Sequence, residues 1–138
     1  MNNNNNFIDK LRSVGLRPTK QRIKICKVLF DRNKTFHFTI SDLKKLLKEK
    51  IDQKISQATV YNTVNALTKK GHLKEISISN EKNYFDTNIS NHHHFFNEST
   101  NELIDLDGQN VGKIKIKKSL PGKKIKSIEV LVKVANNN

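Results

Sequence analysis

Residues 56–71 read SQATVYNTVNALTKKG and predict a helix with one apolar face. The apolar positions recur at the spacing of helical turns: Val60, Val64 and Leu67. Ser56 is in position to cap the N-terminus, and Gly71 is a residue typical of a helix end. The next residues, 72–87, alternate apolar and polar positions on both sides of an Asn-Glu-Lys turn at 80–82 and predict a β-hairpin.

The residues before this helix predict further helices. Residues 7–15 carry apolar side chains on one face, and Thr19 is a candidate N-cap for a helix that runs to about Phe30. Thr39 and Asp42 have the spacing of a capping box ahead of a third helix. Helices followed by a basic hairpin are the arrangement of a winged helix-turn-helix, whose last helix enters the major groove of DNA.

The fold class predicted is therefore α+β, with an N-terminal winged helix-turn-helix and a small C-terminal α/β dimerisation domain. We expect a disordered Asn-rich tail at 1–6, a DNA-binding domain at 7–87, and a dimerisation and sensing domain at 88–135. Strands are predicted at 102–106 and 125–134, whereas 107–124 fits either a short helix or another strand. So short a segment cannot cover its own sheet, which predicts a homodimer.

The composition favours a nucleic-acid partner. Lys and Arg number 26 against 13 Asp and Glu, for a net charge of +13. The single cysteine, Cys26, excludes an internal disulfide and a zinc site of paired cysteines, and its helical position indicates a core residue. No signal peptide or membrane-spanning run is recognisable, so we expect a cytoplasmic protein without a membrane partner. No motif of an enzyme is recognisable, and the chain is not expected to be one.

The outward face of the 56–71 helix has groups that can meet base edges and phosphates. These are Gln57, Thr59, Tyr61, Asn62, Thr63 and Lys69.

Residues 92–96 read HHHFF and form the second distinctive feature. In an extended chain His92 and His94 share one side and His93 takes the other. Imidazole is a common metal ligand, and more distant candidates to complete a site are His37, His72 and Asp86. The two adjacent phenylalanines would also suit haem, with histidine as the axial ligand. A merely structural histidine-rich loop is the third interpretation.

Five segments together resemble the ferric uptake regulator (Fur) family. They are GLRPTKQR (15–22), SQATVYNTVNALTKKGHLKEI (56–76), YFDTN (84–88), HHHFF (92–96) and ELIDL (102–106). Within this family the chain looks most like the iron response regulators (Irr) of alphaproteobacteria. The resemblance implies a homodimeric, DNA-binding repressor of haem-synthesis and iron-homeostasis genes that responds to iron or haem. In place of haem, the effector is alternatively a divalent ion: Fe, Mn or Zn.

The resemblance also assigns residues to DNA binding. It places base contacts at Tyr61 and Asn62, with Arg17 supporting them on the DNA backbone. Asparagine at position 62, where many family members have arginine, favours the Irr subgroup and a different operator. The full DNA-binding set predicted is Arg17, Thr19, Arg22, Gln57, Thr59, Tyr61 and Asn62.

For sensing, the resemblance implies a metal site at His37, Asp86 and His93, with Phe95 at a fourth ligand position. A second family site would use His92 and His94, but its two remaining ligand positions are Gly112 and Ser127. The structural zinc site of Cys-x-x-Cys pairs is missing from the sequence. These departures favour haem bound by His92, His93 and His94.

Overall fold

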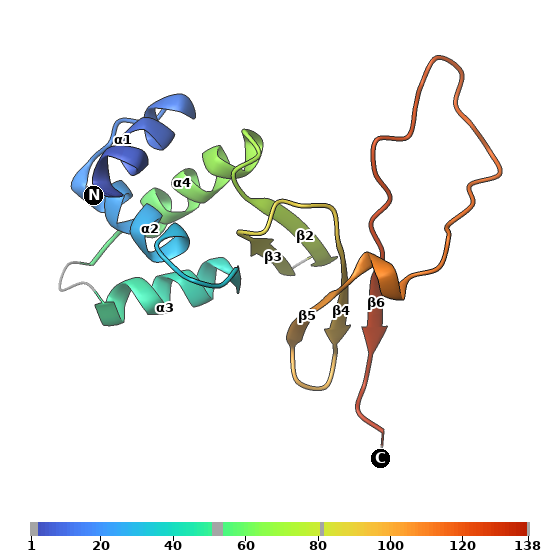
Figure 1. Ribbon diagram of the computed structural model, residues 1–138. Helices are drawn as coiled ribbons and strands as arrows, with labels where there is room; N and C mark the ends of the chain where they lie inside the picture. The colour runs from blue at the N-terminus through green and yellow to red at the C-terminus, as the bar shows by residue number, and fades with distance from the viewer. Residues whose placement is uncertain (1–2, 51–53, 81, 138) are drawn as a thin grey trace. The chain divides into compact units, whose positions relative to one another are not determined.

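The computed structural model describes residues 3–50, 54–80 and 82–137, and these form two units, Met1–Ile89 and Ser90–Asn138 (Figure 1). The sequence predicted the division two residues earlier, between positions 87 and 88. Each unit has its own sheet, and the first also contains the helices. This confirms the predicted α+β class.

The first unit contains the four helices of the described residues: α1 (Asn3–Ser13), α2 (Lys20–Phe30), α3 (Ile40–Lys50) and α4 (Gln57–Lys69). Helix α1 begins at Asn3, so residues 3–6 of the expected tail are helical, while residues 1 and 2 lie outside the described part. None of the described helices has the length and apolar character needed to cross a bilayer.

The predicted caps are present at three helix starts. Thr19 Oγ1 accepts a hydrogen bond from the Arg22 backbone N–H at 3.3 Å at the start of α2. Thr39 Oγ1 accepts from the Asp42 N–H, and Asp42 Oδ2 accepts from the Thr39 N–H, both at 3.0 Å. This reciprocal pair is the capping box that the sequence predicted ahead of α3. At α4, Ser56 Oγ accepts from the Thr59 N–H at 3.2 Å.

Replacing Ser56 with alanine should lower the free energy of unfolding by about 1 kcal/mol, because the cap satisfies an N–H that has no partner within the helix. Urea denaturation measures the change. Ser56→Asp is the matched control, since aspartate caps as well as serine and suits the positive end of the helix dipole. Equal losses in both variants would contradict the capping role.

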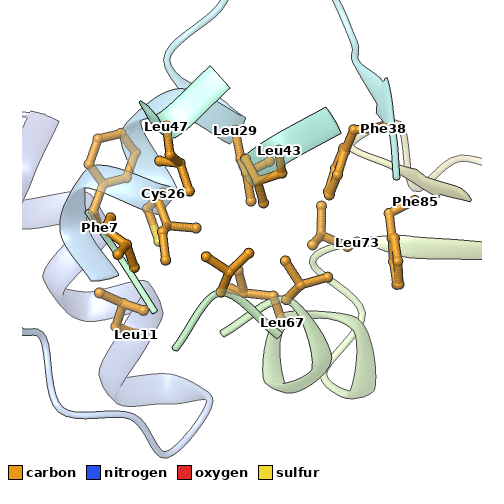
Figure 2. Close-up of a cluster of buried hydrophobic side chains, with 14 of the residues drawn as sticks. Phe7, Leu11, Cys26, Leu29, Phe38, Leu43, Leu47, Leu67, Leu73 and Phe85 are labelled. Atoms are coloured by element: carbon orange, nitrogen blue, oxygen red, sulfur yellow. The ribbon is translucent and has the colours of Figure 1, made fainter. Parts of the chain in front are cut away.

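A single apolar core joins all four helices of this unit to its sheet (Figure 2). Leu11, Leu29, Leu43 and Leu67 come from different helices, and each is at most 1% exposed. Cys26 lies among them fully buried, and burial raises the pKa of its thiol to about 12. The thiol is therefore protonated near neutral pH and acts as a small core residue, as predicted.

The sheet of the first unit has the order β1-β3-β2. Strands β2 (Lys74–Ser79) and β3 (Lys82–Asp86) form the predicted hairpin, although Glu81 of its turn lies outside the described residues. The short strand β1 (His37–Phe38), which the sequence did not predict, pairs antiparallel with β3. Helices α2 to α4 followed by this hairpin have the order of a winged helix-turn-helix.

The second unit contains β4 (His93–Asn97), β5 (Glu102–Leu106) and β6 (Leu131–Val134), in the order β5-β4-β6. The histidine tract thus leads into the central strand. Strand β5 has the predicted bounds, but only the last four residues of the predicted 125–134 strand are in β6. The physical reason is where the pairing begins: the parallel β4–β6 register starts at His94–Leu131, so residues 125–130 precede the paired part of β4.

The segment between β5 and β6 forms neither of the structures considered for it. After a 3₁₀ turn, η1 (Gly108–Asn110), residues 111–130 have no regular secondary structure. Within them, the Leu120 carbonyl accepts a hydrogen bond from the Lys123 N–H at 3.0 Å. Gly122 in this turn has φ +71°, a conformation that glycine adopts without strain.

Candidate metal centre and nucleic-acid interface

Two histidines and an aspartate converge on one side of the second sheet. The β4–β5 register places His94 directly opposite Asp105, and His92 lies two residues before His94, on the same side. The Nε2 atoms of His92 and His94 are each 3.3 Å from Asp105 Oδ1. The ligand atoms of these three residues lie within 4.8 Å of one another. Two imidazole nitrogens and a carboxylate oxygen are a donor set suited to a divalent transition metal.

The hydrogen bond of His92 supports this interpretation. Its Nδ1 lies 2.7 Å from the Ser90 carbonyl oxygen, which can only accept, so Nδ1 carries a proton. In the neutral ring Nε2 then has a lone pair, and this lone pair faces the Asp105 carboxylate. Two acceptors at that distance are favourable only with a cation between them, either a proton or a metal ion. A backbone carbonyl that orients the distal ring N–H is also the usual support of a metal-binding histidine.

His93 has a different environment. Its Nδ1 accepts a hydrogen bond from the Val130 backbone N–H at 2.9 Å, across to the segment that leads into β6. The proton of the neutral ring is then on Nε2, which leaves no free lone pair for a metal. Phe95, at the fourth ligand position implied by the resemblance, pairs with Ile104 of β5 and offers no donor atom. The geometry of this unit therefore brings together His92, His94 and Asp105 as candidate ligands, and His93 is not in this group.

The first unit brings together two more of the predicted metal residues. The β1–β3 register pairs His37 with Asp86, and His37 Nε2 lies 3.1 Å from Asp86 Oδ2. Asp86 is fully buried, and its Oδ1 accepts a hydrogen bond from the Asn88 N–H at 2.8 Å. A buried carboxylate requires such partners. His72, the other histidine considered, is not among the possible metal ligands found in the described residues.

Asp105 is the candidate ligand that the sequence reasoning missed. The sequence did contain a pattern that points to Asp105. Four residues separate Asn97 from Glu102, which is the length of a hairpin loop. Pairing those two residues and counting back places Asp105 opposite His94, which is the observed register.

Helix α4 presents most of its predicted DNA-facing residues to solvent. Gln57, Asn62 and Lys69 are exposed, and Tyr61 is 56% exposed. Thr63, in contrast, was wrongly placed on this face. It is fully buried, and its Oγ1 donates to the Thr59 carbonyl at 2.7 Å, because position 63 lies next to the apolar stripe of the helix.

A hollow of about 420 Å³ lies between α4 and the hairpin of this unit. Tyr61 and Asn65 line it from the helix, and Lys82 and Asn83 line it from β3. Asn65 is a further exposed polar residue of this surface, at helical spacing from Tyr61, and the prediction did not include it.

The remaining predicted DNA contacts lie around the start of α2. Arg17 has an exposed side chain, while its carbonyl accepts a hydrogen bond from Arg22 Nη1 at 3.0 Å. This hydrogen bond from Arg22 therefore stabilises the turn that precedes α2. The hydroxyl groups of Thr19 and Thr59 also have local partners, since Thr19 caps α2 and Thr59 Oγ1 lies 2.9 Å from Ser56 Oγ. Arg17 is the residue of this group most available to a phosphate.

The chain is similar to several proteins of known family. The sequence pattern of the Ferric uptake regulator family matches residues 13–133. The peroxide-responsive repressor PerR of Staphylococcus epidermidis is 32% identical over 99 residues, which are 72% of this chain and 64% of that protein. The peroxide operon regulator of Bacillus subtilis is also 32% identical over 99 residues, 72% of this chain and 66% of that protein. The chain thus spans slightly under two thirds of these relatives.

Solved structures share the fold. The ferric uptake regulator of Pseudomonas aeruginosa, determined with manganese, superposes with a TM-score of 0.69 at 19% identity and covers 96% of this chain and 98% of its own. The Vibrio cholerae ferric uptake regulator gives a TM-score of 0.69 at 20% identity, over 94% of this chain and 98% of its own. With the family pattern matched over most of its length, the chain belongs to the Ferric uptake regulator family.

Proposed function

We propose that this protein is a DNA-binding transcription repressor whose affinity for DNA depends on a bound divalent metal ion. The observation that carries the proposal is the convergence of His92 Nε2 and His94 Nε2 on Asp105. Two similarities support it: the relatives in Staphylococcus epidermidis and Bacillus subtilis are named as a repressor and an operon regulator, and the Pseudomonas aeruginosa structure was determined with manganese.

Two groups of residues are the proposed metal ligands. The first is His92, His94 and Asp105, and the second is the pair His37 and Asp86. Both combine imidazole nitrogen with carboxylate oxygen, a mixture that suits Fe, Mn or Zn better than Mg or Ca, which prefer oxygen alone. The histidines must be neutral to bind, so metal affinity is expected to fall as the pH becomes acidic.

The proposed DNA-binding surface is the exposed face of α4 with Arg17. Tyr61, Asn62 and Gln57 are the base-reading candidates, because they are exposed and lie on one helix. The net charge of +13 supplies the non-specific attraction to phosphates.

A homodimer is part of the proposal. In the second unit, the described residues that are buried are His94, Phe96 and Leu106, which is too small a core for a sheet of this size. Ile104 on the edge strand β5 is 44% exposed. Pairing with a second copy would cover such residues and give the two-fold symmetry of most operators.

Haem, as in the Irr subgroup, is the second candidate effector. Three adjacent histidines followed by Phe95 and Phe96 favour it. The geometry fits a small cation better, because His94 is only 4% exposed and both Nε2 atoms face a carboxylate, not an open apolar surface.

Metal removal tests the proposal. Untagged protein, stripped with a chelator, is titrated by fluorescence anisotropy into a duplex that the native protein has selected from a random pool. Adding Mn²⁺, Zn²⁺ or anaerobic Fe²⁺ should strengthen binding about 5- to 150-fold, the range of a typical coupling free energy. A DNA affinity that no metal changes would contradict the proposal. Haem added in a separate arm, giving a Soret band and release of the duplex, would assign the protein to the haem-responsive subgroup.

A further inference from the structure

A basic groove lies beside the N-terminal half of α4. It has a volume of about 580 Å³ and is formed by α3, by Lys54 and Ile55, and by the first turn of α4. Lys44, Lys45, Lys48 and Lys54 line it, and the buried core residues Leu47 and Val60 border it. We refer to it as the α3–α4 groove.

The charge of the groove is of one sign. Four lysines line it, and none of the described residues that line it is an aspartate or a glutamate. Lys44 and Lys48 are one helical turn apart, so both project from the same side of α3. Both side chains are exposed, so their ammonium groups are accessible. Such a surface attracts a polyanion and repels cations.

One contact links this basic surface to the base-reading helix. Lys44 Nζ donates a hydrogen bond to Gln57 Oε1 at 3.1 Å. Gln57 is the first residue of α4 and one of the proposed base-reading residues. The lysines therefore lie beside the end of α4 that reaches furthest into a major groove, since the N-terminal residues of a recognition helix contact the base edges.

The position of α3 before the recognition helix indicates that the polyanion is the DNA backbone. In a helix-turn-helix the helix before the recognition helix crosses the DNA backbone. We propose that the α3–α4 groove is a phosphate cradle in which Lys44, Lys48 and Lys54 hold the sugar-phosphate backbone next to α4. The ammonium groups of the three lysines contact successive phosphates. This inference rests on the proposed DNA-binding function and adds three residues to the predicted set.

The test is the salt dependence of DNA binding by the full chain. The variant Lys44→Gln, Lys48→Gln, Lys54→Gln is compared with wild type on the selected duplex and on an unrelated duplex of equal length. The slope of log K against log salt concentration should fall by about 0.9 for each phosphate that is no longer neutralised, and so by about 2.7 for three. Affinity should fall by the same factor on both duplexes, because phosphate contacts carry no sequence information.

The matched control removes the same charge elsewhere. Lys27, Lys34 and Lys70 are exposed in the same unit and do not line the groove, so their replacement with glutamine should change the slope by less than one. Thermal denaturation verifies that each variant is folded. If the triple variant does not fold, the single variant Lys48→Gln replaces it, with an expected decrease in the salt slope of about 0.9.

Each outcome decides the proposal. An unchanged slope in the triple variant, or equal changes in variant and control, overturns the cradle and leaves the proposed function intact. A loss confined to the selected duplex also overturns it, because the lysines would then read bases. Wild-type protein that binds neither duplex overturns both proposals.

Discussion

Replacing both His92 and His94 with alanine is expected to abolish tight binding of a divalent metal and, with it, the metal-dependent gain in DNA affinity. The two side chains supply the nitrogen atoms that face Asp105, and one carboxylate cannot hold a transition metal tightly alone. Losing only a hydrogen bond that supports a metal ligand costs about 10- to 100-fold in affinity, so losing two ligands should cost more than about 100-fold. Calorimetric titration of Mn²⁺ or Zn²⁺ into untagged protein measures the loss.

His93→Ala is the matched control for this experiment. It removes an imidazole from the same tract, but its Nδ1 accepts from the Val130 N–H, so the loss should reduce stability with little effect on metal affinity. The opposite pattern, with metal binding lost in His93→Ala and kept in the double variant, would restore the ligand set implied by the family resemblance. Asp105→Asn tests the third ligand, since it keeps the shape of the side chain and removes the charge.

The pair in the first unit requires its own variants. His37→Ala removes the imidazole that lies 3.1 Å from Asp86. Loss of metal affinity in this variant would support His37 as a ligand, whereas reduced stability alone would indicate a structural ion pair around a buried carboxylate.

The second large effect is expected at Tyr61. Tyr61→Ala should reduce discrimination between the selected and the unrelated duplex by about 1–3 kcal/mol, where every 1.4 kcal/mol is a factor of ten. The helix should remain folded, because Tyr61 is 56% exposed and the buried stripe of α4 is intact. Parallel anisotropy titrations on the two duplexes measure the difference.

Tyr61→Phe separates the contribution of the hydroxyl from that of the ring. If discrimination falls in Tyr61→Ala but not in Tyr61→Phe, the aromatic ring and not the hydroxyl recognises the bases, for example through contact with a thymine methyl. Unchanged discrimination in Tyr61→Ala would show that α4 does not read bases through this residue. The lysines of the α3–α4 groove should behave in the opposite way, with weaker binding and unchanged discrimination.

Local signals in the sequence predicted much of the first unit. Thr19, Ser56 and the Thr39–Asp42 pair act within three residues of their partners, so their capping roles are readable from spacing alone. The errors arose where a boundary depended on distant residues. Strand β6 is shorter than its alternating pattern because its parallel pairing with β4 starts only at His94–Leu131, so residues 125–130 precede the paired part of β4. Strand β1 forms because β3, more than forty residues further along the chain, lies beside it.

The sequence by itself determined the class of this protein. Its helix periodicity, its caps, its basic charge and its five motifs predicted a winged helix-turn-helix of the ferric uptake regulator family. It also determined that His92 and His94 lie on one side of an extended chain, since that follows from the period of a strand.

Only the tertiary structure decided which histidines face a carboxylate. The β4–β5 register brings Asp105 opposite His94. His93 Nδ1, in contrast, accepts a hydrogen bond from the Val130 N–H, in the segment that leads into β6. Both contacts join residues that are distant in sequence, and strand pairing, not local propensity, selects the side of the sheet on which each donor lies. For that reason the tract HHHFF predicted a ligand-binding site, while the identity of its ligands depended on the folded sheet.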